Sequence, residues 1–114
     1  MDTCIAIVSD MIFASRISST AKMVGTKCRI ISNAGDLQSA LESQEIAMVL
    51  VDMACDAISP EEAIRTVKSH CPSARVIAFF SHVQTELMEQ AKAAGADDVW
   101  PRSTFVQRLP SLLE

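Results

Sequence analysis

A short apolar run at residues 47–52 constrains the fold more than any other stretch of this sequence. It consists mostly of β-favouring residues and ends abruptly on a carboxylate, Asp52. A run of this length, bounded by polar residues and too short for an ordinary helix, is typical of a parallel strand that is covered on both faces. The sequence therefore predicts a buried central strand with one acidic side chain at its exit.

Further apolar runs alternate with stretches of helical periodicity. The expected strands cover residues 3–8, 28–31, 47–52, 75–80 and 98–100. The expected helices carry apolar stripes within residues 13–24, 37–41, 63–67, 87–94 and 105–113. Short connections between alternating strands and helices favour a parallel sheet, because right-handed crossovers place helices on both of its faces. We therefore predict an α/β fold with a doubly wound, five-stranded parallel sheet.

Several residues mark the helix ends. Ser59 is expected to cap the third helix, with Pro60 at its first position, where the missing N–H costs no hydrogen bond. Asp36 and Ser103 are the expected N-caps of the second and last helices. Pro110 is expected to kink the last helix.

Composition narrows the class of protein. The 114 residues fit one domain, residues 1–114, whose core must be largely aliphatic because aromatic residues make up only 4%. A net charge of -4 without a basic cluster argues against direct binding of nucleic acid. No apolar run approaches the roughly 20 residues that span a bilayer, and the first residues lack a basic region. We expect a cytoplasmic protein that does not bind membranes.

The four cysteines are scattered along the chain. Cys4, Cys28, Cys55 and Cys71 lack the close paired spacing of a zinc site or a C-x-x-C redox motif. Small buried thiols are the expected interpretation. Cys55 is the exception, because it follows Asp52 closely and is expected in an exposed loop.

Polar residues close four of the five predicted strands. In doubly wound sheets, ligands bind beyond the carboxyl ends of the strands, where the strand order reverses. The residues at these ends are Ser9 and Asp10, Asp52, Ser81, and Arg102. We expect Asp10, Asp52, Ser81 and Arg102 to surround one shallow pocket.

With these residues in place, residues 4–113 resemble the receiver domain of two-component response regulators. The resemblance implies the strand order 2-1-3-4-5. It also implies that Asp52 corresponds to the phosphoacceptor, Ser81 to the switch hydroxyl, and Arg102 to the position of the invariant lysine. Asp10 corresponds to one of the two metal-binding acids, so Asp10 and Asp52 are the candidate ligands of a weakly bound Mg²⁺. The segment at residues 93–98 is similar to the run that precedes the family's fifth strand.

The sequence also departs from the family pattern. Ser9 stands where the first acid of the metal-binding pair is usual, and His82 stands where a small residue is usual. Val99 replaces the usual aromatic switch residue, and residues 53–59 contain no glycine. In the family pattern these positions supply a metal-binding acid, leave room for the phosphoryl group, act as a switch residue, or belong to the loop after the phosphoacceptor. The departures therefore concern the phosphorylation chemistry and leave the fold unaffected.

The family's Lys-Pro pair is also absent, because Pro101 precedes Arg102. A one-residue gap would instead align Trp100 and Pro101 with that pair and leave no cation there. Arg102 presents a planar fork that can hold a carboxylate in a bidentate grip, whereas lysine is a mobile point charge. We expect an ion pair between Arg102 and Asp52, which would lower the pKa of Asp52. The alternative is a solvated arginine at the start of the last helix.

Three functions follow from this comparison. The preferred hypothesis is an atypical receiver, or pseudo-receiver, that serves two-component-type signal transduction as a protein interaction module and not as an enzyme. The first alternative is a phosphorylatable receiver that accepts a phosphoryl group on Asp52 from a histidine kinase. The second is a small-molecule-binding α/β domain, although the chain has no glycine-rich phosphate loop. The expected partners are proteins, with a histidine kinase among the candidates, and the oligomeric state stays open.

Overall fold

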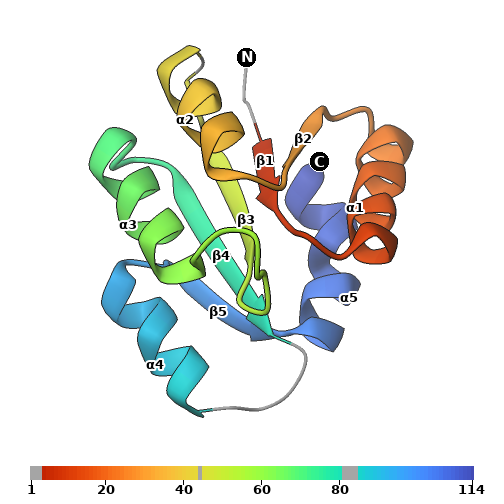
Figure 1. Ribbon diagram of the computed structural model, residues 1–114. Coiled ribbons are helices and arrows are strands. Elements are labelled where there is room, and N and C mark those ends of the chain that lie inside the picture. The colour runs from red at the N-terminus through yellow and green to blue at the C-terminus, as the bar shows by residue number, and fades with distance from the viewer. Residues whose placement is uncertain (1–3, 44, 81–84) are drawn as a thin grey trace.

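The computed structural model describes residues 4–43, 45–80 and 85–114. Within these residues five strands alternate with five helices (Figure 1). The strands are β1 (Cys4–Ile7), β2 (Cys28–Ile31), β3 (Met48–Asp52), β4 (Arg75–Phe80) and β5 (Asp98–Pro101). The helices are α1 (Met11–Val24), α2 (Ala34–Ser43), α3 (Pro60–His70), α4 (Thr85–Ala94) and α5 (Arg102–Leu113). All strand pairs are parallel and the order is β2-β1-β3-β4-β5. The predicted fold and strand order are confirmed.

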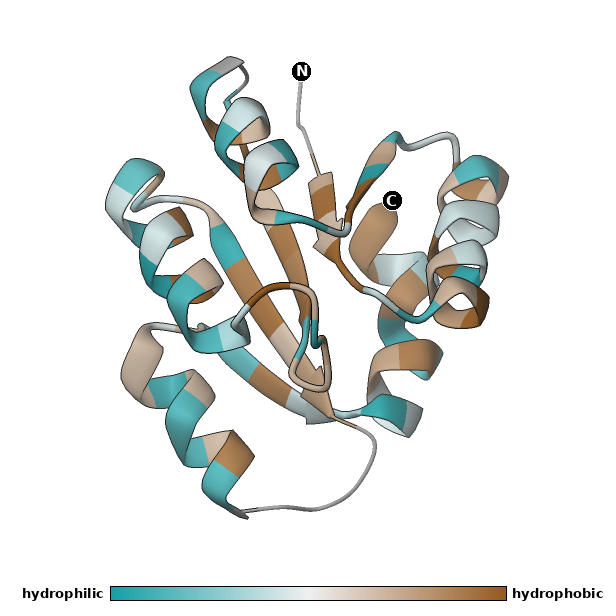
Figure 2. Ribbon diagram, viewed as in Figure 1, coloured by the Kyte–Doolittle hydropathy of each residue, from teal (hydrophilic) through white to brown (hydrophobic). Residues whose placement is uncertain are grey.

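Two layers of helices cover the sheet, with α2, α3 and α4 on one face and α1 and α5 on the other (Figure 1). Figure 2 shows long hydrophobic stretches along the central strands and a mixture of hydrophilic and hydrophobic residues along the helices. Each face has its own core of buried side chains, built from alternate residues of the same strands. No helix in the described part of the chain is long and apolar enough to cross a membrane.

The central strand β3 lies between β1 and β4. Val49 and Val51 point toward the α2–α4 face, whereas Leu50 points toward α1 and α5. All three side chains are fully buried, as the apolar run predicted. Because side chains alternate along a strand, Asp52 shares the α1/α5 side with Leu50.

The helix caps agree with the sequence at one of three predicted positions. The Ser59 Oγ accepts a hydrogen bond from the Glu62 backbone N–H at the start of α3, as expected. The prediction for Asp36 is wrong: Asn33 lies three residues earlier, and its Oδ1 accepts from the Asp36 N–H, so α2 begins almost a turn sooner. The prediction for Ser103 is also wrong, because α5 begins directly after Pro101 and no side chain caps it.

Pro110 lies inside α5, where the sequence placed it, and the expected kink of the helix stays a prediction. The strand before this helix runs one residue further than expected. Pro101 has extended backbone and closes β5, so the chain passes from strand to helix without a loop.

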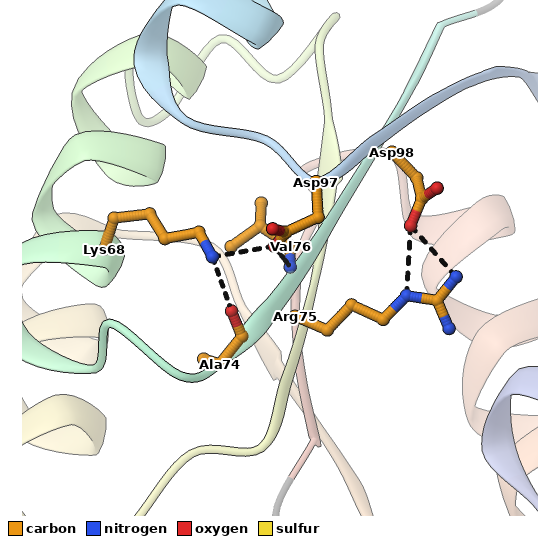
Figure 3. Close-up of polar contacts among 6 residues, drawn as sticks. All are labelled: Lys68, Ala74, Arg75, Val76, Asp97 and Asp98. Carbon is orange, nitrogen blue, oxygen red and sulfur yellow. Dashed lines mark hydrogen bonds and ion pairs between the residues drawn. The ribbon is translucent and has the colours of Figure 1, made fainter.

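A polar network fixes the amino-terminal ends of β4 and β5 (Figure 3). The Asp97 carboxylate lies 2.7 Å from the Lys68 Nζ and accepts a hydrogen bond from the Val76 N–H at 2.8 Å. Lys68 also donates to the carbonyl of Ala74. One residue further on, Asp98 pairs with Arg75 at 2.9 Å. The segment before β5 is thereby tied to α3 and β4, which supports the fold at the end of the sheet opposite Asp52.

The four cysteines are free thiols. Cys4 and Cys55 are buried, and Cys28 and Cys71 are half-buried. The expectation that Cys55 lies exposed is wrong, since its side chain is 6% exposed. After Asp52 the chain folds back over the sheet, so Cys55 packs in the core beneath α2 and α3 together with Ile58.

Candidate functional site

Asp52 is the only polar or charged side chain among the buried residues of the described chain, with 2% of its surface exposed. It is the last residue of β3, where the strand register ends and the loop toward α3 begins. Its Oδ1 accepts a hydrogen bond of 2.9 Å from the Ala54 backbone N–H. The loop therefore holds one carboxylate oxygen in place and leaves Oδ2 directed to another partner.

That partner is Arg102, the first residue of α5. Its Nη2 lies 3.4 Å from Asp52 Oδ2, so the structure brings the two predicted partners together and excludes the solvated alternative. The Arg102 side chain is 30% exposed and that of Asp52 3%, so the guanidinium lies between the carboxylate and solvent. Arg102 does bring a cation to Asp52, and the choice between the two alignments left open by the sequence stays a prediction.

A cluster of three aromatic side chains, Phe13, Phe79 and Phe105, packs next to this ion pair. The guanidinium carbon of Arg102 lies 4.4 Å from the ring centroid of Phe13. Phe13 packs against Phe79, and Phe79 stacks on Phe105 at 4.1 Å between centroids. The Arg102 Nε is buried among these groups without a hydrogen-bond partner in the described residues. The guanidinium is thus positioned by its contact with Phe13 as well as by the ion pair.

The pKa of Asp52 is raised above its ordinary value, chiefly because burial disfavours the charged form. The Ala54 N–H and the Arg102 guanidinium lower the pKa, and the negative charge of Asp10 raises it further. The expected net lowering of the Asp52 pKa is therefore wrong: Arg102 acts in the expected direction, but burial outweighs its effect. At 3.4 Å the ion pair is longer than a strong charge-assisted hydrogen bond, and it offsets only part of the cost of burying the carboxylate.

Asp10 lies just beyond the end of β1, the strand next to β3. It is exposed and acts as the N-cap of α1, because its Oδ1 accepts from the N–H groups of Ile12 at 2.9 Å and Phe13 at 3.2 Å. This capping role was not predicted from the sequence. An aspartate directly before a helical stripe is the usual signal for an N-cap, and Asp10 precedes α1 in this way.

The acidic groups do not form a ready site for a divalent cation. Both oxygens of Asp52 already have donors, and one of these donors is a cation, Arg102. Asp10 has one oxygen engaged in capping, and its neighbour Ser9 is neutral. In the described part of the chain no three His, Cys, Asp or Glu side chains are grouped as metal ligands. A hard cation needs several oxygen ligands, and this donor set does not provide them in the present arrangement.

The remaining predicted residues divide between described and undescribed positions. Ser81 and His82 lie outside the described residues. Ser9 is half-buried at the end of β1. Val99 packs against the core beneath α4, whereas Trp100, the next residue, packs against the α1/α5 core and contacts Arg108. The aromatic ring of Trp100 therefore faces the opposite side of the sheet from Val99 and does not take its place.

Comparison with known proteins adds structural neighbours only. No protein-family profile matches the sequence, and no curated protein matches it. A response regulator from Burkholderia pseudomallei superposes with a TM-score of 0.85 at 18% identity, over 100% of this chain and 67% of that one. A response regulator from Thermotoga maritima gives 0.82 at 18% identity, over 99% and 94%. The chemotaxis response regulator CheY4 of Vibrio cholerae gives 0.83 at 14% identity, over 99% and 96%. At these identities the likeness establishes the fold.

Proposed function

We propose that this chain, which has the fold of response regulator receiver domains, is a pseudo-receiver: a protein interaction module of two-component-type signalling in the cytoplasm. One observation carries the proposal. The carboxylate at the phosphoacceptor position, Asp52, is buried and paired with Arg102, so it is not open to a phosphoryl donor. The domain, residues 1–114, is then held in one conformation that a partner protein recognises without phosphorylation.

The chemistry of phosphoryl transfer explains why this pairing matters. An aspartate accepts a phosphoryl group only if a carboxylate oxygen can reach the phosphorus and a cation offsets the arriving charge. One similar structure, the Burkholderia pseudomallei response regulator, contains a phosphorylated aspartic acid and a calcium ion. In this chain Arg102 already occupies one oxygen of Asp52, and Ser9 contributes no charge for a metal ion. Mg²⁺ is therefore expected to bind weakly.

A phosphorylatable receiver is the second candidate, and a specific observation favours it. Asp52 still ends the central strand, and Asp10 follows the end of the adjacent strand β1. If the Arg102 side chain swings into solvent, through its 30% exposed face, these two acids are the residues that remain beside an incoming metal ion. In that case a histidine kinase is the expected phosphoryl donor.

Intact-mass measurement after incubation with Mg²⁺ and acetyl phosphate separates the two functions. The proteins compared are the wild type, Asp52→Asn, and the double variant Ser9→Asp/Arg102→Lys, which restores the acid and the mobile ammonium of the family pattern. We expect no phosphoryl adduct on the wild type or on Asp52→Asn. The double variant is expected to gain an adduct, because its Asp52 is released and its metal site has a second acid.

An adduct on the wild type that Asp52→Asn abolishes would refute the pseudo-receiver and support the phosphorylatable receiver. A double variant without an adduct would show that features besides Ser9 and Arg102 block the reaction. Circular dichroism of all three proteins serves as the control for folding.

A further inference from the structure

Cys4 and Cys28 form a pair of thiols at the amino-terminal end of the sheet. Their sulfur atoms lie 3.3 Å apart. They begin two adjacent parallel strands, β1 and β2, and are direct partners in the strand register. Both pack in the core of the α1/α5 face. The backbone pairing of the two strands therefore places the two cysteine side chains next to each other.

The backbone at this position is compatible with a covalent link. Neighbouring strands lie about 4.8 Å apart, so register partners fall within the separation of about 4.4–6.8 Å between Cα atoms that disulfides bridge. The two other cysteines offer a natural contrast. Cys55 and Cys71 pack on the opposite face of the sheet, beneath α2–α4. Formation of a bond from Cys4 or Cys28 to either of them would require the sheet to open.

Cys28 is the more exposed member of the pair. Cys28 is half-buried and lines a surface cavity of about 230 Å³ together with Lys22 and Lys27. The hydrogen bond shared with Cys4 lowers the pKa of Cys28 despite its burial, and the same hydrogen bond raises the pKa of Cys4. A partly exposed thiol near lysines is the usual setting of a reactive cysteine. Cys28 is thus the thiol expected to react with an oxidant first, whereas Cys4 is 5% exposed and lines a separate cavity of about 300 Å³.

We propose that Cys4 and Cys28 are a site of reversible oxidation, at which hydrogen peroxide converts the two thiols into a disulfide between β1 and β2. The Cys28 thiolate attacks the peroxide oxygen, which breaks the O–O bond and gives a sulfenic acid and water once a proton is taken up. The Cys4 sulfur then attacks the Cys28 sulfur, releases the second water and loses its proton. Two thiols are oxidised, and one hydrogen peroxide is reduced to two waters.

The disulfide would close the β1–α1–β2 unit covalently. Asp52 lies at the other end of the sheet, since it ends β3 whereas the two cysteines begin their strands. The proposed oxidation therefore does not depend on the state of Asp52, nor does it rest on the proposed function as a protein interaction module. In the presence of thiol reductants the pair stays reduced, as it is in this structure.

The test is a disulfide map of the protein after oxidation. The reduced full chain, freed of reductant, is treated with hydrogen peroxide, its remaining thiols are alkylated, and it is digested with trypsin without reduction. We expect residues 1–16 to be linked to the dipeptide Cys28–Arg29. The intact oxidised protein is expected to lose the mass of two hydrogen atoms, to be alkylated at Cys55 and Cys71 only, and to regain four free thiols with dithiothreitol.

Two variants sharpen the result. Cys28→Ser should abolish the loss of the hydrogen atoms, and Cys71→Ser should leave it unchanged, because Cys71 is also half-buried but lies on the other face. The proposal is overturned if all four thiols stay alkylatable, if Cys28 is oxidised to a sulfinic acid without a link, or if the link joins two chains or includes Cys55 or Cys71. The map of the wild type alone decides the question if a variant does not fold.

Discussion

Replacing Asp52 with asparagine should stabilise this protein near neutral pH. The carboxylate is 2% exposed, and taking an ion out of water costs several kcal/mol. The hydrogen bond from Ala54 repays about 1.5–3 kcal/mol. Arg102, with a 3.4 Å contact and a 30% exposed side chain, adds about 1 kcal/mol or less. Burial of the charged Asp52 side chain therefore has a net cost on the order of 1 kcal/mol. Asp52→Asn removes this cost and keeps a side-chain oxygen that can accept the hydrogen bond from the Ala54 N–H.

The pH dependence gives this prediction its sign. The pKa of Asp52 is higher in the folded protein than in the unfolded chain, so the folded state binds the proton more tightly. Its contribution to stability is fully present below the unfolded pKa and is lost as the pH rises through the folded pKa. The wild type and Asp52→Asn should therefore have similar free energies of unfolding in acid. The variant should become more stable as the pH approaches neutrality.

Urea denaturation followed by circular dichroism at several pH values measures this difference. The matched control is Asp56→Asn, which removes the same charge from an exposed position in the loop after β3. It should change the free energy of unfolding by no more than about 0.5 kcal/mol. If Asp52→Asn instead loses more than about 1 kcal/mol at neutral pH, the ion pair would exceed its desolvation cost and the reasoning fails.

Three further predictions concern other positions. Ser9→Asp should tighten the binding of Mg²⁺ in a calorimetric titration, because it adds a carboxylate beside Asp10; an unchanged affinity would exclude this position from the site. Asp97→Ala should lower the free energy of unfolding by about 1 kcal/mol in urea denaturation, since the Val76 N–H loses its acceptor. Burial raises the pKa of Asp97, but the contacts with Lys68 and Val76 outweigh burial and lower it. The stabilisation by Asp97 is therefore present above the unfolded pKa and fades as the pH falls through the folded pKa. A stability difference between wild type and Asp97→Ala that grows in acid would contradict this prediction. Ser59→Ala should cost about 0.5–1 kcal/mol in thermal melts through loss of the α3 cap, and an unchanged melt would show that the 3.4 Å contact contributes nothing.

The order of elements was predictable because burial and periodicity are local properties of the chain. The run that ends on Asp52 indicated a central strand, and Ser59 followed by Pro60 marked the start of α3. The caps of α2 and α5 were not predictable in the same way. Asn33 and Asp36 both have side chains suited to capping, and only the path of the chain decides between them.

Two features that were not predicted depend on which residues the fold brings together. The contact between Cys4 and Cys28 follows from the register of β1 and β2, which an apolar pattern alone does not specify. The pairing of Arg102 with Asp52 could be expected from charge and strand order. The raised pKa of Asp52 could not, because it depends on how closely the residues around Asp52 exclude water.

The central claim is that Asp52 is a buried carboxylate paired with Arg102, which lowers its pKa. The most direct test is an NMR pH titration that follows the side-chain carboxyl carbon of Asp52. In the wild type the pKa should lie above that of a solvated aspartate, because burial is the largest influence. In Arg102→Ala it should rise further, since the cation that lowers it is gone. A wild-type pKa below the ordinary value, or one that Arg102→Ala leaves unchanged, would contradict the account.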